Sequence, residues 1–329
     1  MKTIHHTLLV LGSALGFVFL SPAILAQTPY LANQITLNPF NTNPAAAGIY
    51  RYVPIQMTVR QQWLGMNAAP SVRAVSMHAN LKAAGRTYNP AGFLNKGKHS
   101  FGKVGVGGGV FNFSHGSISQ TGLHLDYAYH IFLGRGRLSL GLAPMYHQFR
   151  IDKSKFIMPD GDDYDPVIHD DPVESLHFFD ANVGAHYYSD LLFAGISIIQ
   201  MFNSRAMFGT MSYERLDDPN QNPYLARCFY AYAGLTMVAG DWLGIEPTLM
   251  ASYNQAGKPG LQAGLQVRIA EIVEAGVVYV VGESLGFTAG TTFNLIQLKY
   301  LFQTPLGDAR NAPFNTHQLM AGYLLQQSW

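Results

Sequence analysis

The sequence is poor in charge. Asp, Glu, Lys and Arg make up 12% of its 329 residues and the net charge is +1. That share is about half of what globular proteins usually carry. Without a strongly basic surface, there is no reason to expect a nucleic acid as a partner. Aromatic residues reach 12% and Gly numbers 33. With a mean hydropathy of +0.07, the composition is too polar for a helical membrane protein, but it suits one that faces lipid through strands.

Cysteine is nearly absent as well. The single Cys228 excludes an internal disulfide, and the aromatic residues around it predict a packed, inert thiol. Long apolar runs are also missing after the N-terminus, where no stretch is long enough for a membrane helix. We therefore expect neither a disulfide scaffold nor a helical bundle in the membrane.

The N-terminus predicts export. Lys2 precedes an apolar run from Leu8 to Leu20, and small residues lead up to Ala26. This pattern is typical of a secretory signal, here residues 1–26, cleaved after Ala26. The alternative is a membrane anchor, for which the apolar run is too short to span comfortably.

What recurs along the chain is alternation with a period of two residues. It is clearest in segments 55–63, 123–131, 261–269 and 285–294. The polar face carries Gly, Gln, Ser, Thr and His, whereas a soluble sandwich would carry Lys and Glu there. Neutral, small polar groups suit a barrel lumen, with the apolar face against lipid. Closure also satisfies every backbone N–H and C=O within hydrocarbon. The sequence therefore predicts an all-β fold, a transmembrane antiparallel β-barrel.

About fourteen strands are expected, and twelve or sixteen remain open alternatives. The candidate segments are 52–63, 70–80, 101–113, 118–132, 137–150, 177–189, 191–202, 225–239, 242–254, 260–270, 272–282, 284–294, 295–303 and 316–326. Residues 27–50 have no strand pattern and form an irregular segment, a plug of the lumen or a docking segment, ahead of the barrel at 51–329. If the chain starts in the periplasm, the long connections 151–176 and 203–224 lie outside. The basic stretch 82–100 would then be a long inward loop.

Two groups of residues are candidates for chemical sites, one for binding Ca²⁺ and one for hydrolysis. Asp160, Asp162, Asp163 and Asp165 offer oxygen ligands for Ca²⁺, but they lack the spacing of the EF-hand loop, and a solvated acidic loop is favoured. His124, Asp126 and His130 share a face near Ser117 and Ser119, which raises a Ser-His-Asp hydrolase. A hydrogen-bonded pair in the lumen is the favoured interpretation. We expect no enzyme activity, no cofactor and no metal centre.

Two stretches near the start, LNPFNTNPAAAG and VRQQWLGMNAAPSVRAVSMHA, resemble the start of the PorP/SprF family of Bacteroidota outer-membrane proteins. The matching positions are Asn43, Pro44, Ala45, Ala47, Gly48, Arg60, Gln62, Trp63, Gly65, Ala69 and Pro70. Segment 122–152 is similar to the strand-turn-strand of the family, and 316–325 to its closing strand. The chain departs from the family pattern at Asn67–Ala68 and in the longer stretch 82–100.

The resemblance implies a role in the type IX secretion and gliding system of the outer membrane. The implied partners are a secreted adhesin with a C-terminal sorting domain and the periplasmic part of the machinery, and the implied action is binding. A diffusion channel for small solutes is the alternative. For residues 43–48, two interpretations stay open: an architectural element that sets the closing register, or a docking surface.

Overall fold

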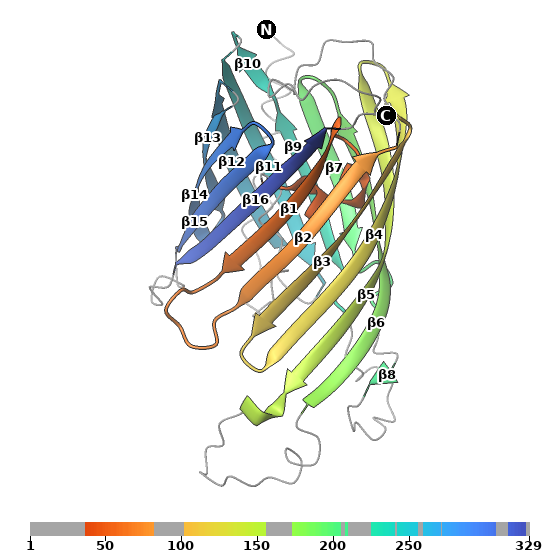
Figure 1. Cartoon of the computed structure of the whole chain (residues 1–329), viewed down its shortest axis with the longest axis vertical. Coiled ribbons are helices and arrows are strands. Elements are labelled where there is room, and N and C mark those ends of the chain that lie inside the picture. The colour runs from red at the N-terminus through yellow and green to blue at the C-terminus, as the bar shows by residue number, and fades with distance from the viewer. Residues whose placement is uncertain are drawn as a thin grey trace, which may run out of the picture.

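The computed structural model describes residues 37–81, 102–155, 173–204, 208–209, 225–240, 242–255, 259–270, 272–306 and 315–326. Its strands form one antiparallel sheet that closes on itself (Figure 1). The strands are β1 (Tyr52–Gln61), β2 (Ser71–Asn80), β3 (Val104–His115), β4 (Ile118–Leu133), β5 (Gly136–Asp152), β6 (Val173–Tyr188), β7 (Leu192–Ile199), β8 (Phe208–Gly209), β9 (Cys228–Leu235), β10 (Met237–Ala239), β11 (Leu243–Asn254), β12 (Pro259–Ile269), β13 (Val273–Val280), β14 (Ser284–Phe293), β15 (Ile296–Pro305) and β16 (Thr316–Gln326).

The wall of the barrel has fourteen strands, as the sequence predicts. Of the sixteen strands, β8 pairs only with β6, while β9 and β10 both pair with β11 and count as one. The ring closes between the first and last strands, where Tyr52 is opposite Gln326 and Gln61 is opposite His317. Closure leaves no sheet edge exposed to lipid.

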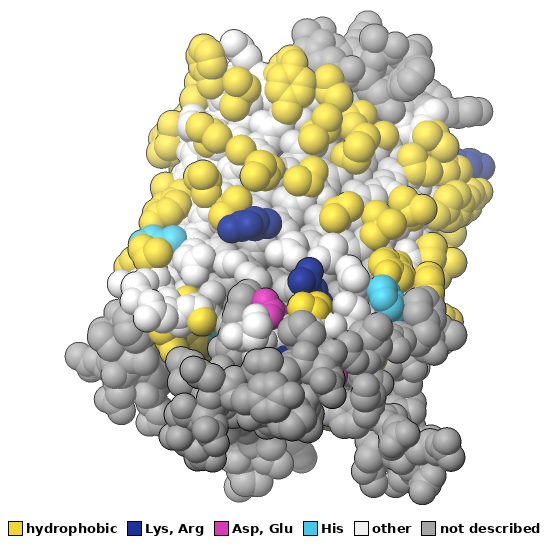
Figure 2. All heavy atoms as spheres, turned by 60° about the horizontal axis from the view of Figure 1, so that its bottom comes forward, with side chains coloured by type: hydrophobic (Ala, Val, Ile, Leu, Met, Phe, Trp, Pro, Cys, Tyr) yellow, Lys and Arg dark blue, Asp and Glu magenta, His cyan; other side chains and the backbone are white. Residues whose placement is uncertain are grey.

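The two faces of each strand follow the predicted alternation. On β12, Leu265 on the outer face is 48% exposed, whereas the neighbouring Gln266 in the lumen is 5% exposed. Figure 2 shows apolar side chains spread over the outer wall, with few charges among them. Among the described residues, no helix is long and apolar enough to cross a membrane. The predicted burial of Cys228 is confirmed by its 4% exposure.

The barrel has two different ends. We call the end that holds the connections 62–70, 153–172 and 200–227 the loop end; it lies at the bottom of Figure 1. The opposite end, where β1 begins and β16 finishes, is the turn end. Several connections at the turn end are short, such as Gly134–Arg135 between β4 and β5, whereas the predicted inward loop 82–100 lies outside the described residues.

Some predicted strand limits were wrong. The strand expected over 225–239 is broken at Thr236, because Pro247 on β11 lies opposite the break and has no N–H to donate. The strand expected over 191–202 stops at Ile199, because Gln200 adopts a φ of +59°. Asp180 then accepts backbone N–H groups from Phe202 and Ser204, each at 2.9 Å, and holds the turn in place.

Candidate functional site: the segment inside the barrel

Residues 37–49 lie inside the barrel. Two 3₁₀ turns, η3 (Pro39–Asn41) and η4 (Pro44–Ala46), each follow an Asn. The Asn38 side chain accepts from the Phe40 N–H at 3.1 Å, and Asn43 accepts from the Ala45 N–H at 2.9 Å. Asn is a preferred N-cap, and Pro fits the first position of a turn because its missing N–H would have no partner there. The two Asn-Pro pairs therefore build this segment locally.

This lumen segment, Leu37–Ile49, crosses the barrel from wall to wall. Leu37 contacts Leu301 of β15 and Met320 of β16. On the opposite wall, the Asn43 amide nitrogen lies 3.1 Å from the Ala185 carbonyl oxygen and 3.2 Å from that of Ile196. Asn43 is completely buried, as are Ala45, Ala46 and Ala47. The lumen segment is thus enclosed by the wall.

Glycines on three strands make room for the lumen segment. A Cβ at Gly105 of β3 would overlap the Ala47 carbonyl, and one at Gly141 of β5 would overlap the Ala45 backbone. At Gly184 of β6, a Cβ would overlap the Asn43 side chain. The wall and the lumen segment are therefore in direct backbone contact, which no larger residue at these positions would permit.

The lumen segment returns to the wall at Gly48. Its backbone N–H donates to His78 Nδ1 at 3.0 Å, and its carbonyl accepts from the Asn80 amide at 3.2 Å. Gly48 has a φ of +71°, a left-handed conformation that favours glycine. Earlier in the segment, the Ser197 hydroxyl donates to the Thr42 carbonyl at 2.6 Å. Residues of β2 and β7 thus hold the two ends of the turn η4.

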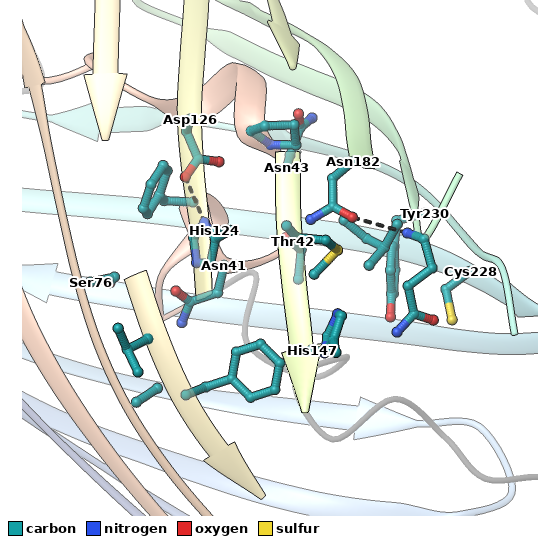
Figure 3. Close-up of a pocket in the computed structure, with 18 of the residues that line it drawn as sticks. Asn41, Thr42, Asn43, Ser76, His124, Asp126, His147, Asn182, Cys228 and Tyr230 are labelled. Atoms are coloured by element: carbon teal, nitrogen blue, oxygen red, sulfur yellow. Dashed lines mark hydrogen bonds and ion pairs between the residues drawn. The ribbon is translucent and has the colours of Figure 1, made fainter. Parts of the chain in front are cut away.

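A pocket lies between the lumen segment and the loop end (Figure 3). Thr42 and Asn43 border it, together with His124, His147 and Asn182 from the wall. His147 is fully buried, and its Nε2 has no hydrogen-bond partner. The pocket therefore presents imidazole rings, an amide and the carboxylate of Asp126, which also lines it, beside the lumen segment.

The candidate hydrolase residues do not assemble. His124 Nδ1 lies 2.6 Å from Asp126 Oδ2, which is the hydrogen-bonded lumen pair that the sequence favoured. Ser119, however, has the same parity on β4 as Leu123, which is 44% exposed on the outer face. The wall therefore separates Ser119 from His124, and Ser117 lies in the turn between β3 and β4.

Three charged side chains at the turn end of the lumen lie close together. Lys299 Nζ lies 2.8 Å from Glu274 Oε1, and Arg268 Nε lies 3.8 Å from Glu274 Oε2. Tyr50, which precedes β1, stacks on His78 at 5.5 Å between ring centroids. Burial, followed by the nearby carboxylate of Glu246, raises the pKa of Tyr50 to about 12, so its phenol is neutral at physiological pH.

The residues matched to the family motif fall into two separate groups. Asn43, Pro44, Ala45, Ala47 and Gly48 lie in the lumen segment. The others lie at the loop end of β1 and in the connection that follows: Arg60, Gln62, Trp63, Gly65, Ala69 and Pro70. There the Gln62 N–H donates to the Pro70 carbonyl at 2.9 Å. Trp63 is 40% exposed and meets the His115 ring edge-on, with 6.2 Å between centroids.

Some predicted residues are not described by the structure, and some site residues were not predicted. Asp160, Asp162, Asp163 and Asp165 lie outside the described residues, as does the signal segment 1–26. Sequence reasoning missed Gly105, Gly141 and Gly184. These glycines lie on the lumen face of their strands. A glycine within a strand often marks the close approach of another backbone, and this pattern could have identified them.

A closed antiparallel wall, apolar outside and polar inside, defines a transmembrane β-barrel of the outer membrane. A model of the family "Type IX secretion system membrane protein PorP/SprF" matches residues 24–323. The chain therefore belongs to the PorP/SprF family and is a type IX secretion membrane protein, as the resemblance implied.

The chain is also similar to solved structures, at low sequence identity and with TM-scores below 0.5. The CymD monoaromatic hydrocarbon channel is 11% identical, with a TM-score of 0.48 over 93% of this chain and 95% of that one. Omp33 of Acinetobacter baumannii is 8% identical, with a TM-score of 0.47 over 84% of this chain and 100% of that one. A FadL homologue of Pseudomonas aeruginosa is 10% identical, with a TM-score of 0.44 over 88% and 94%. No curated protein matches the chain.

Proposed function

We propose that the protein is a non-enzymatic component of the type IX secretion system. It binds a secreted adhesin that carries a C-terminal sorting domain, and it links this adhesin to the periplasmic machinery. Membership of the PorP/SprF family supports a role in the type IX secretion system. The observation that carries the binding role is the lumen segment, which crosses the barrel and is held by both walls.

A filled lumen favours binding over diffusion of solutes. A barrel of about fourteen strands leaves a path for solutes unless side chains or a segment fill it. Here the lumen segment runs from Leu301 on one wall to Ala185 on the other, and its residues Ala45 to Ala47 have no exposed surface. The rival role, a diffusion channel for small solutes, would require this segment to leave.

The proposed orientation places the loop end outside the cell. Bacterial barrels have long extracellular loops and short periplasmic turns. β5 has 17 residues, and β4 and β6 have 16 each. A strand needs only about 9–11 residues to cross the hydrocarbon. These three strands therefore continue past the membrane, and in Figure 1 β5 and β6 reach farthest at the loop end, where a secreted partner would arrive.

The proposal is tested in a strain that lacks the gene and is complemented with the tagged chain. We expect the deletion to remove at least one adhesin with a sorting domain from the cell surface, and the tagged barrel to copurify with it. Leu249→Ala, which changes a side chain that is 60% exposed on the outer wall, is the matched control and should restore display. Normal display without the chain, combined with a large steady conductance of the purified barrel in planar bilayers, would support the channel instead.

A further inference from the structure

Arg60 is a buried cation that lacks an acidic partner. It points into the lumen near the loop end of β1 and is 5% exposed. Its guanidinium donates from Nη2 to Gln303 Oε1 at 3.2 Å. When the Gln62 amide oxygen faces the guanidinium, it accepts from Nε and Nη2, each at 3.2 Å. Among the described residues, no carboxylate lies within 4.0 Å of this group.

Lys299, the other buried Lys or Arg side chain among the described residues, has an acidic partner. Lys299 is 8% exposed, and its ammonium is paired with Glu274 at 2.8 Å. Burying a charge without a counter-charge is costly, because neutral amides replace only part of the lost hydration. Arg60 therefore has unused capacity to bind an anion, whereas Lys299 does not.

A second group next to Arg60 also lacks partners. Gln318 of β16 is directly opposite Arg60 in the sheet register. Its side chain is 1% exposed, and neither its amide nitrogen nor its amide oxygen has a hydrogen-bond partner. A buried amide without partners costs free energy comparable to a lost hydrogen bond. Arg60 and Gln318 thus place a guanidinium and unused amide donors side by side on the lumen wall.

We propose that Arg60, Gln62, Gln303 and Gln318 form a carboxylate-binding site. Its ligand is an acidic side chain or a C-terminal carboxylate of a polypeptide, namely the secreted partner of the proposed function, on which this assignment of the source rests. One guanidinium among neutral amides matches a group with one negative charge, and Nη1, which neither Gln303 nor Gln62 engages, offers two N–H donors to a carboxylate. A phosphate, which carries up to two charges, would require a second cation.

The position of the site determines the direction of entry. Arg60 lies one residue before the loop-end limit of β1, and the lumen segment lies between this level and the turn end, where Gly48 is held by β2. A ligand that approaches from the turn end would meet the lumen segment first. Arg60 and Gln318 lie on the loop-end side of the lumen segment, the side from which a polypeptide outside the cell would approach.

The test uses the full-length barrel, purified in detergent, and a fluorescein-labelled octapeptide that carries two Glu residues and a free carboxylate. Fluorescence polarisation should report binding to the unaltered chain. In Arg60→Gln, binding should be weaker by about tenfold to a hundredfold, the range for hydrogen bonds to a charged group. The matched control is Arg268→Gln, which removes a lumen arginine near Glu274 at the turn end and should change binding by less than about twofold.

Three outcomes decide the proposal. Acetate should compete with the peptide and inorganic phosphate should not; stronger competition by phosphate would overturn the carboxylate assignment. Equal affinities of the unaltered chain and Arg60→Gln would overturn the site, as would absence of binding to the unaltered chain. If Arg60→Gln does not fold, as judged by heat-modifiable migration, Gln318→Leu keeps the charge and should still weaken binding by about tenfold.

The peptide assay does not involve adhesin display. Failure of the carboxylate site therefore leaves the proposed secretion role standing, and failure of adhesin display leaves the peptide result standing.

Discussion

The amide nitrogen of Asn43 lies 3.1 Å from the hydroxyl of Tyr232, although 189 residues separate the two along the chain. The same hydroxyl lies 2.9 Å from His186 Nδ1. With the carbonyls of Ala185 and Ile196, the two N–H groups of Asn43 have three acceptors within reach. One side chain of the lumen segment thus connects β6, β7 and β9.

The first prediction concerns Asn43. Asn43→Ala should lower the free energy of unfolding by about 1–3 kcal/mol, because buried acceptors on β6 and β7 lose their donor. The measurement is the temperature at which the purified barrel loses its heat-modifiable migration. Tyr232→Phe, which removes only the hydroxyl, should have a smaller effect. A larger effect of Tyr232→Phe would show that the Tyr232–His186 contact matters more than the lumen segment.

The second prediction concerns the wall glycines that contact the lumen segment, Gly105, Gly141 and Gly184. Gly141→Ala should displace the lumen segment, because its new methyl group would overlap the Ala45 backbone, at a cost of about 1–3 kcal/mol. Displacement should appear as a raised single-channel conductance in planar bilayers. Gly244→Ala is the matched control, since a Cβ there makes only ordinary contacts, with Arg268 Cβ at 3.7 Å and the Arg268 carbonyl oxygen at 3.9 Å. Identical conductance in both variants would mean that the segment adjusts without opening the lumen.

The third prediction concerns the two faces of β12. Leu265→Arg should reduce the amount of assembled barrel, because an arginine facing lipid at mid-membrane costs about 2–4 kcal/mol. Gln266→Arg should be tolerated far better, since it faces the lumen opposite Glu246 in the register. Immunoblots of outer membranes with and without heating measure the folded fraction. Similar losses in the two variants would contradict the assignment of faces on this strand.

The fourth prediction concerns orientation. In a Cys228→Ala background, Ser154→Cys at the loop end should react with a membrane-impermeant maleimide on whole cells. Arg135→Cys, in the short turn between β4 and β5 at the opposite end, should react only after the outer membrane is permeabilised. Ser154 and Arg135 are both exposed, so accessibility within the protein is matched. The reverse labelling pattern would invert the proposed orientation.

The sequence by itself determined the class of fold and the side of each strand. Whether a residue faces lipid depends on parity, a local property, so Leu265 and Gln266 could be assigned without knowing their neighbours. The same reasoning failed where a neighbouring strand decides how far a strand extends. An example is the break between β9 and β10, near Pro247 of β11. The Asn-Pro pairs at 38–39 and 43–44 favour turns locally, but nothing in them states where in the barrel those turns lie.

Only the tertiary structure decided what the lumen contains. The contacts of Asn43 join residues 142, 153 and 189 positions away, and the close approach of Ala45 to Gly141 exists only once the wall has closed. That no carboxylate of the described residues lies within 4.0 Å of Arg60 is likewise invisible in a sequence, because it depends on every strand around the lumen. Strand periodicity is set by neighbours in the chain, whereas the contents of a closed barrel are set by which distant strands the closure brings face to face.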